Sequence, residues 1–265
     1  MIGAHAPGQA GLSLRMQAFS GSLDAGERDC LKFRLSLASA ARLDRHFEIS
    51  ADPVRRRQFF DLLRLTLATQ PFHRRVPRHG IAYLGRPAFM TDALLAGLRD
   101  EASAMRPSAR ANHEQFIVTV DTPHEATLCE RMASSRLLLE LVTRHAGPCQ
   151  ASHISSYIYY DQAGQCSKPH VDNAFTALTA MIGLRHDHEH EHDRPPASAS
   201  ASIAYWPDCA PLAYRLAPGE IAVFFGSGVL HGRTPVAENE IVHSLLLSFR
   251  PRLDDERSPD DDVPR

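Results

Sequence analysis

The sequence changes character at Pro148, and this change constrains the fold more than any other feature. Before it the pattern is largely helical, and Asp52-Pro53 and Thr91-Asp92 supply good helix starts. After it, short β-rich runs separated by turns lie at residues 152–160, 174–184, 200–206, 212–216, 220–225 and 241–249. Several short strands at this spacing predict a sandwich or a barrel. Helices first and strands second predict an α+β chain in which a helical layer supports a β-barrel.

Four segments are expected along the chain. The first is rich in Gly, Ala and Ser without periodicity, so a loose arm is predicted there, and the last carries an acidic charge run and is predicted to be disordered. Within the helical segment, residues 81–84 and 115–120 are strand-like and interrupt the helices. The predicted segments are a flexible arm at 1–21, a helical support region at 22–148, a β core at 149–252 and an acidic tail at 253–265.

Three residues of the second half have the types and spacing of a metal site. In a β-strand, side chains alternate between faces, so His170 and Asp172 are expected to point the same way. His231, from a distant strand, can close one triangular face of a metal ion. Two imidazoles and one carboxylate with the opposite positions open form a ligand set of non-haem Fe(II) sites. For each residue taken singly, the alternative is a buried polar group satisfied by hydrogen bonds.

Composition and charge argue against several classes of protein. At 265 residues and 43% hydrophobic, the chain can bury a full core. A net charge of −2 gives no sign of the excess of basic residues that nucleic-acid binding or a polybasic membrane patch would need. Five cysteines, odd in number and without a C-x-x-C pair, favour reduced thiols in the cytoplasm. No signal-peptide pattern and no apolar stretch of about 18 residues is present, so a cytoplasmic protein without a membrane partner is expected.

The surroundings of the three ligand candidates resemble the iron(II)/2-oxoglutarate-dependent dioxygenases, and within them the prolyl-hydroxylase-like branch. There, a tyrosine ends one strand, a Gly-containing turn follows, and the chain re-enters with His-X-Asp. Tyr160 and the Gly-containing turn that leads to His170 and Asp172 have this layout. The run 216–225 is similar to the Pro-Gly turn and apolar strand before the distal histidine of the family, and 231–236 matches its His-X-X-X-Pro-Val turn.

The resemblance implies a double-stranded β-helix (jelly roll) core, with Fe(II) held by His170, Asp172 and His231 and with 2-oxoglutarate as cosubstrate. It implies no catalytic residue beyond the metal ligands, a role for the Tyr160 hydroxyl in binding 2-oxoglutarate, and stimulation by ascorbate. The implied reaction hydroxylates an unactivated C–H of a small molecule, an amino acid or a biosynthetic intermediate, and releases succinate and CO2. Asp172 stands where halogenating relatives have Gly or Ala, so halogenation is not expected. The sequence specifies neither the substrate nor the oligomeric state.

The cation that should bind the far carboxylate of 2-oxoglutarate is displaced in this chain. The family usually places a guanidinium or ammonium about ten residues after the distal histidine, often two before a serine, where the fork of Arg suits a carboxylate. Ser244 is present, but the position two before it is Val242. Strand alternation puts Arg250 on the face of Ser244, eight residues beyond Val242 and about 26 Å away on a straight strand. Arg233 and, with a register shift of one, His243 are the other candidates.

Other functions stay open. A peptidyl or prolyl hydroxylase would use the same site on a protein side chain. A non-catalytic metal-binding or sensor protein is supported by the displaced cation and by the His-rich tract at 185–194, which is predicted to be a solvated acidic loop. An oxidative nucleic-acid dealkylase would use Arg250, but the near-neutral charge weighs against it. Iron-dependent succinate formation from 2-oxoglutarate distinguishes the enzyme from the sensor.

Overall fold

The computed structural model describes residues 15–16, 18–44, 47–112, 117–121, 127–188 and 199–252. The acidic tail, most of the N-terminal arm and the His-rich tract after His188 lie outside these residues. The described helices are α2 (Ala25–Ala40), α3 (Pro53–Ala68), α4 (Asp92–Met105), α5 (Leu128–Ala133) and α6 (Arg136–Ala146), with short 3-10 turns at His73–Arg75, Arg78–Gly80 and Arg106–Ser108. The described strands are β1 (Ile81–Gly85), β2 (Arg110–Asn112), β3 (Ile117–Asp121), β4 (Cys149–Tyr160), β5 (Ser167–His170), β6 (Leu178–His188), β7 (Ser202–Ala204), β8 (Leu212–Tyr214), β9 (Ile221–Phe224), β10 (His231–Arg233) and β11 (Glu240–Pro251).

The helices begin and end where the local chemistry of the sequence places them. The Asp52 carboxylate accepts hydrogen bonds from the first backbone N–H groups of α3, and the Thr91 hydroxyl accepts one from Leu94 in α4. Helix α6 ends at Gly147, whose φ of 83° disfavours any residue with a Cβ. Both predicted helix starts are therefore confirmed. Among the helices of the described ranges, none has the length and apolar content needed to cross a membrane.

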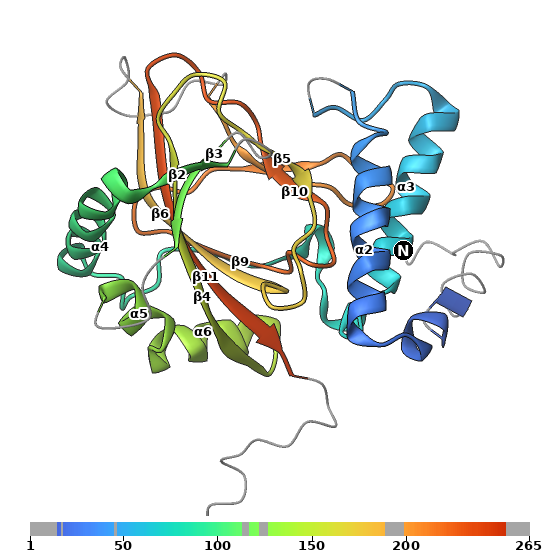
Figure 1. Ribbon diagram of the computed structural model, residues 1–265, viewed down its shortest axis with the longest axis horizontal. Coiled ribbons are helices and arrows are strands. Elements are labelled where there is room, and N and C mark those ends of the chain that lie inside the picture. The colour runs from blue at the N-terminus through green and yellow to red at the C-terminus, as the bar shows by residue number, and fades with distance from the viewer. Residues whose placement is uncertain are drawn as a thin grey trace, which may run out of the picture.

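The strands form two antiparallel sheets (Figure 1). The larger sheet has the order β1-β9-β6-β11-β4-β3-β2, and the smaller has the order β5-β10-β7-β8. The predicted α+β class, with helices and antiparallel strands, is confirmed. The strand-like segments of the helical half are β1 and β3, and with β2 they extend the larger sheet at both of its edges.

The six β-rich runs of the sequence correspond to β4, β6, β7, β8, β9 and β11. Three strands lie outside the predicted β-rich runs: β2, β5 and β10, which have 3, 4 and 3 residues. His170 and His231 were nevertheless expected on strands, and they lie on β5 and β10. Strand β6 runs to His188, so the predicted loop at 185–194 is wrong for residues 185–188. The reason is pairing: residues 185–188 lie opposite 240–243 of β11, and this ladder outweighs the polar composition of the segment.

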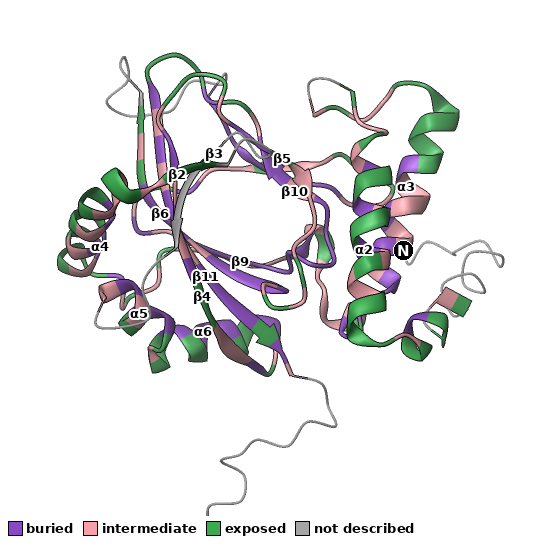
Figure 2. Cartoon of the chain, viewed as in Figure 1, coloured by how far each residue is buried: buried purple, intermediate pink, exposed green. Residues whose placement is uncertain are grey.

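Two helical layers enclose the sheets. Helices α4, α5 and α6 cover the outer face of the larger sheet, where Leu98 and Leu138 pack with Tyr157 and Leu245 in the main core. Helices α2 and α3 lie on the side of the smaller sheet, and Figure 2 shows β9 and most of β11 buried between the two layers. The inner faces of the two sheets are packed face to face, and the site described below lies between them.

Helix α3 is held to the smaller sheet by a second apolar cluster. Phe59 is fully buried and meets the ring of Tyr205 edge-on at 5.7 Å between centroids. We expect Phe59→Ala to lower the free energy of unfolding by about 3–5 kcal/mol, because truncating a fully buried aromatic ring leaves a cavity. Phe60→Ala, at a half-buried neighbouring ring, should cost clearly less. Urea unfolding followed by circular dichroism measures both, and equal costs would show that α3 does not pack through Phe59.

Candidate metal centre

The side chains of His170, Asp172 and His231 converge on one point. Each offers a ligand atom, and these atoms lie within 4.8 Å of one another. Nε2 of His170 is 3.5 Å from Oδ1 of Asp172, and Nε2 of His231 is 3.7 Å from the same oxygen. Ligand atoms about 2 Å from a shared ion must lie this close together, so the predicted convergence is confirmed.

Strand pairing brings the two histidines together. His231 opens β10 and lies directly opposite His170, which ends β5, and residues opposite each other share a face of the sheet. Asp172 is not part of a strand, contrary to the alternation argument, because β5 stops at His170. A hydrogen bond of 3.0 Å from its backbone N–H to the Gly226 carbonyl fixes the segment after the strand. The hydroxyl of Thr179 lies 3.5 Å from Oδ2 of Asp172.

Gly226 shapes the space that the carboxylate occupies. A Cβ at this position would lie 1.9 Å from Oδ2 of Asp172, so any side chain would push the carboxylate away. Sequence analysis missed this residue because nothing in the local pattern marks it. Gly226 therefore belongs to the site although it offers no ligand atom.

Both imidazoles are oriented by backbone carbonyls. Nδ1 of His170 lies 2.7 Å from the Lys168 carbonyl, and Nδ1 of His231 lies 2.9 Å from the Val229 carbonyl. A carbonyl only accepts, so each Nδ1 carries the hydrogen and each Nε2 presents its lone pair to the centre. Outer hydrogen bonds of this kind are typical of metal-ligating histidines.

The electrostatics of the cluster favour an ionised carboxylate. Burial raises the pKa of Asp172, but the charges and hydrogen bonds of His231 and His170 outweigh it, and the net pKa lies below its usual value. Burial lowers the pKa of His231 below its ordinary value, although Asp172 opposes this. For His170, burial also lowers the pKa, but Asp172 reverses the direction and the net pKa is raised. Two imidazoles and one carboxylate fit a divalent transition metal such as Fe(II).

A cavity of about 110 Å³ extends from these residues between the two sheets. Ile158, Met181, Phe224 and Leu246 form its apolar walls. Its polar lining consists of hydroxyl groups and one guanidinium, from Tyr160, Ser167, Ser202, Tyr214, Ser244 and Arg233. The cavity therefore combines the metal-binding cluster with a single cation and several neutral hydrogen-bonding groups.

The cation in this cavity is Arg233, which is only 3% exposed. Its Nη1 and Nη2 donate to the hydroxyls of Ser200 and Ser202 at 3.0 and 3.3 Å. The guanidinium also lies 5.2 Å from the centre of the Tyr160 ring. Burial raises the pKa of Tyr160 to about 12, even though Arg233 lowers it, so the phenol keeps its proton at neutral pH and can donate a hydrogen bond.

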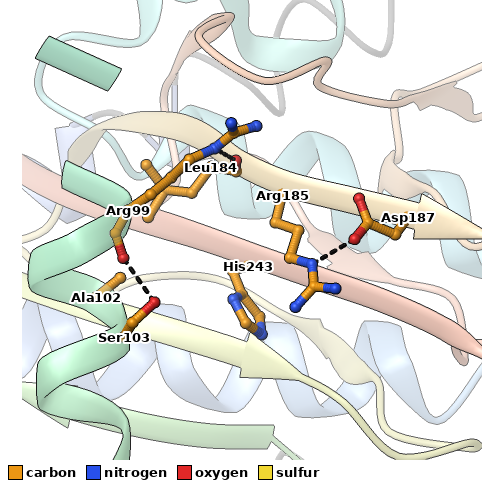
Figure 3. Close-up of a pocket in the computed structure, with 7 residues that line it drawn as sticks. All are labelled: Arg99, Ala102, Ser103, Leu184, Arg185, Asp187 and His243. Atoms are coloured by element: carbon orange, nitrogen blue, oxygen red, sulfur yellow. Dashed lines mark hydrogen bonds and ion pairs between the residues drawn. The ribbon is translucent and has the colours of Figure 1, made fainter. Parts of the chain in front are cut away.

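Two other candidate cations lie elsewhere. Arg250 lines a different cavity at the far end of β11, and His243 lies on the outer face of the larger sheet. Figure 3 shows His243 among Arg99, Arg185 and the other residues of this pocket, which includes none of the three ligand candidates. Burial, assisted by Arg185, lowers the pKa of His243 to about 4, so it is neutral at physiological pH. Ser244 does line the cavity, as strand alternation predicted.

The position of Arg233 depends on a buried carboxylate. Glu240 has an exposed fraction of 2% and accepts hydrogen bonds from the backbone and hydroxyl of Ser200 at 3.0 and 2.5 Å. His186 approaches the same carboxylate at 2.9 Å. Burial raises the pKa of Glu240, but these hydrogen bonds outweigh it and hold the pKa at about 2. Glu240 thus fixes the Ser200 hydroxyl, which accepts a hydrogen bond from Arg233.

No protein-family model and no curated protein sequence matches the chain. Solved structures do match, and among them are non-haem enzymes that depend on 2-oxoglutarate, which is also called α-ketoglutarate. The epimerase SnoN from nogalamycin biosynthesis aligns with a TM-score of 0.53 at 15% identity, over 68% of this chain and 80% of SnoN. SnoN in complex with Fe3+, α-ketoglutarate and nogalamycin RO gives a TM-score of 0.51 at 14% identity, over 68% of this chain and 83% of that one.

A prolyl-4-hydroxylase from Pseudomonas putida aligns with a TM-score of 0.49 at 15% identity, over 64% of this chain and 93% of the hydroxylase. The SnoN alignments show that this chain has a fold found in the 2-oxoglutarate-dependent iron oxygenases. The resemblance stated from the sequence is therefore confirmed at the level of the fold.

Gly226→Ala should weaken binding of a divalent metal ion by about 10–100-fold, the usual effect of disturbing the support of a ligand. The reason is the overlap between the added Cβ and Asp172. Calorimetric titration with Co(II) measures the affinity, and Gly21→Ala, where an added Cβ meets nothing within 4 Å, is the matched control. A folded Gly226→Ala variant with unchanged affinity would remove Asp172 from the metal site.

Glu240 should make the fold sensitive to acid. Its folded pKa of about 2 lies below the ordinary value of 4.5, so its contribution to stability is complete above pH 4.5 and is lost as the pH falls toward 2. We expect the stability difference between the natural chain and Glu240→Gln to shrink by about 3 kcal/mol over that range. Urea unfolding at several pH values measures it, with exposed Glu238→Gln as control. A difference that does not change with pH would contradict the assignment.

Proposed function

We propose that this chain is an Fe(II)- and 2-oxoglutarate-dependent oxygenase with a jelly-roll core. The observation that carries the proposal is a His-Asp-His cluster at one end of a buried cavity whose lining includes a buried guanidinium. The strand order supports the jelly roll: β4-β11-β6-β9 of one sheet faces β5-β10-β7-β8 of the other, and the chain alternates between them along most of its course. Residues 149–252 would form this core, and 22–148 would support it.

His170, Asp172 and His231 would hold the iron through two Nε2 atoms and one carboxylate oxygen. When bound, the metal supplies the redox chemistry that couples decarboxylation of 2-oxoglutarate by dioxygen to oxidation of a substrate C–H. The residues of the chain orient the ligands, leave the opposite face open and exclude water. The apolar walls of the cavity serve this last role.

Arg233 and Tyr160 would bind the far carboxylate of 2-oxoglutarate. His231 and Arg233 are two residues apart on β10, and a strand places such residues on the same face about 7 Å apart. A five-carbon dicarboxylate can bridge this spacing. The guanidinium donates hydrogen bonds to the hydroxyls of Ser200 and Ser202, which fix its position. The Tyr160 hydroxyl adds a neutral hydrogen-bond donor. Ser244 is a further hydroxyl of the same cavity.

The reaction that we propose is hydroxylation of an unactivated C–H of a small molecule, with release of succinate and CO2. Asp172 occupies the position at which halogenating relatives leave room for chloride, which supports hydroxylation over halogenation. A peptidyl or prolyl hydroxylase is the alternative, since the same site could oxidise a protein side chain. We further propose a cytoplasmic enzyme that ascorbate stimulates and that uses no nucleic-acid partner.

The decisive experiment measures succinate formed from 2-oxoglutarate by the purified chain under Fe(II), ascorbate and air. We expect formation that requires iron, is lost in Asp172→Ala and rises with a true substrate. Metal binding by calorimetry is measured in parallel. A chain that binds iron but forms no succinate with any compound of a broad small-molecule panel would favour the sensor alternative.

Arg233→Gln should raise the KM for 2-oxoglutarate by about tenfold or more, because a charge-assisted hydrogen bond is lost. Metal affinity should change little, since the guanidinium does not contact the three ligands. His243→Gln, on the outer face of the larger sheet, is the control and should leave this KM unchanged. The reverse pattern, with only His243→Gln affecting KM, would refute the assignment of Arg233.

A further inference from the structure

The last strand, β11, contributes residues to two cavities, the one that holds Arg233 and a second one. Its residues Ser244, Leu246, Ser248 and Arg250 alternate onto the inner face, while Leu245 and Phe249 belong to the core under α4–α6. Ser248 is paired with Thr179, whose hydroxyl lies 3.5 Å from the Asp172 carboxylate. The metal cluster is therefore level with Ser248 along this strand.

From that level the strand runs in two directions. Ser244 lies four residues back, about 13 Å along the strand, in the cavity that holds Arg233. Arg250 lies two residues forward, about 7 Å along the strand, on the opposite side of the metal cluster. One cation therefore lies on each side of the metal cluster: Arg233, buried, from the smaller sheet, and Arg250, exposed, from β11.

Arg250 lines a second cavity of about 440 Å³. None of the three ligand residues lines this cavity, but two of its lining residues follow the metal site closely in the chain: Ala174 is two residues after Asp172, and Ser227 follows Gly226, whose carbonyl accepts the hydrogen bond of the Asp172 N–H. Helix α2 closes it from outside through Lys32. A molecule bound here would contact Ala174 and Ser227, which follow Asp172 and Gly226 in the chain, and would lie outside the cavity of Arg233.

The lining of the second cavity is apolar with an excess of positive charge. Phe72 and Phe175 supply rings, and Phe175 is 60% exposed, unusual for a large aromatic side chain. Three basic residues and one acidic residue line the same space: Arg28, Lys32, Arg250 and Asp29.

These basic groups differ in what else they bind. Lys32, 4% exposed, is ion-paired with Asp29, and Arg28 donates to the carbonyls of Ser20 and Leu23. Arg250 lies against the side-chain amide of Gln150, a neutral partner. Its charge therefore has no acidic partner among the groups that line the cavity.

We infer that the second cavity binds the substrate, and that the substrate is a small apolar molecule with a carboxylate recognised by Arg250. This inference rests on the proposed function and names the substrate class. A guanidinium binds a carboxylate through two parallel hydrogen bonds, and the apolar walls favour a hydrocarbon body. With the carboxylate at Arg250, the hydrocarbon body extends toward Asp172, where the oxidised C–H must lie.

The test compares 3-phenylpropanoate with its neutral analogue 3-phenylpropanamide by calorimetry, on the full chain loaded with Co(II) and saturated with 2-oxoglutarate. We expect the acid to bind about tenfold or more tightly than the amide, and Arg250→Gln to remove this preference. Arg136→Gln, an exposed arginine in a helix-surface ion pair, is the matched control and should keep it. Arg250→Glu should instead favour 3-phenylpropan-1-amine.

Equal binding of acid and amide by the natural chain would overturn the inference, as would a preference that survives in Arg250→Gln. Tighter binding of a peptide ending in phenylalanine than of the free acid would also overturn it, in favour of a protein substrate.

The substrate inference and the proposed function can fail independently of each other. If metal and 2-oxoglutarate bind but the acid is not preferred, only the substrate class is wrong; if the acid is preferred but 2-oxoglutarate does not bind, the proposed function is wrong.

Discussion

The candidate site depends on one contact between two connecting segments, the hydrogen bond from the Asp172 N–H to the Gly226 carbonyl. The pairing of β5 with β10 already places His170 opposite His231, but a strand pair alone supplies no third ligand. Asp172 lies past the end of its strand, so this hydrogen bond and the missing Cβ of Gly226 determine where its carboxylate stands. The antiparallel strands alone therefore do not complete the metal site. It also needs the non-strand segment that carries Asp172 and the glycine, Gly226, that lies against it.

Burying Arg233 is the second costly feature of the molecule. An isolated charge inside a protein is unfavourable by several kcal/mol, and it persists only when hydrogen bonds and opposite charge offset the loss of water. Here the hydroxyls of two serines accept hydrogen bonds from the guanidinium, and one of these serines, Ser200, also donates a hydrogen bond to Glu240. Such a network is retained where a fixed cation is needed, which a dicarboxylate cosubstrate would require. The same network explains why β6 continues through the polar residues before His188, since His186 contacts Glu240.

The sequence predicted what depends on local chemistry. Helix starts at Asp52 and Thr91, the six β-rich runs and the convergence of three ligand types follow from capping, alternation and residue chemistry. Strands β5 and β10 carried no β-rich pattern, because their residues are mostly polar and their pairing with each other and with β7 forms them. The family resemblance points to a cation on the last strand and so favours Arg250 over Arg233. The signal was present: Arg233 is two residues after His231, and alternation places both on one face. Gly226 had no comparable signal, since its role exists only after the chain has folded.

The two cations explain why the usual anchor position can be apolar. Val242 is 3% exposed and packs with Tyr160 and Val236, so an arginine there would have to displace this cluster. With Arg233 entering the same space from the opposite sheet, a second guanidinium at 242 would add repulsion and no new partner. The larger sheet is then free to carry its cation at the other end, at Arg250. The smaller sheet thus carries the proposed cosubstrate anchor, buried Arg233, and the larger sheet carries the proposed substrate anchor, exposed Arg250, so the two carboxylates would bind on opposite sides of the metal cluster.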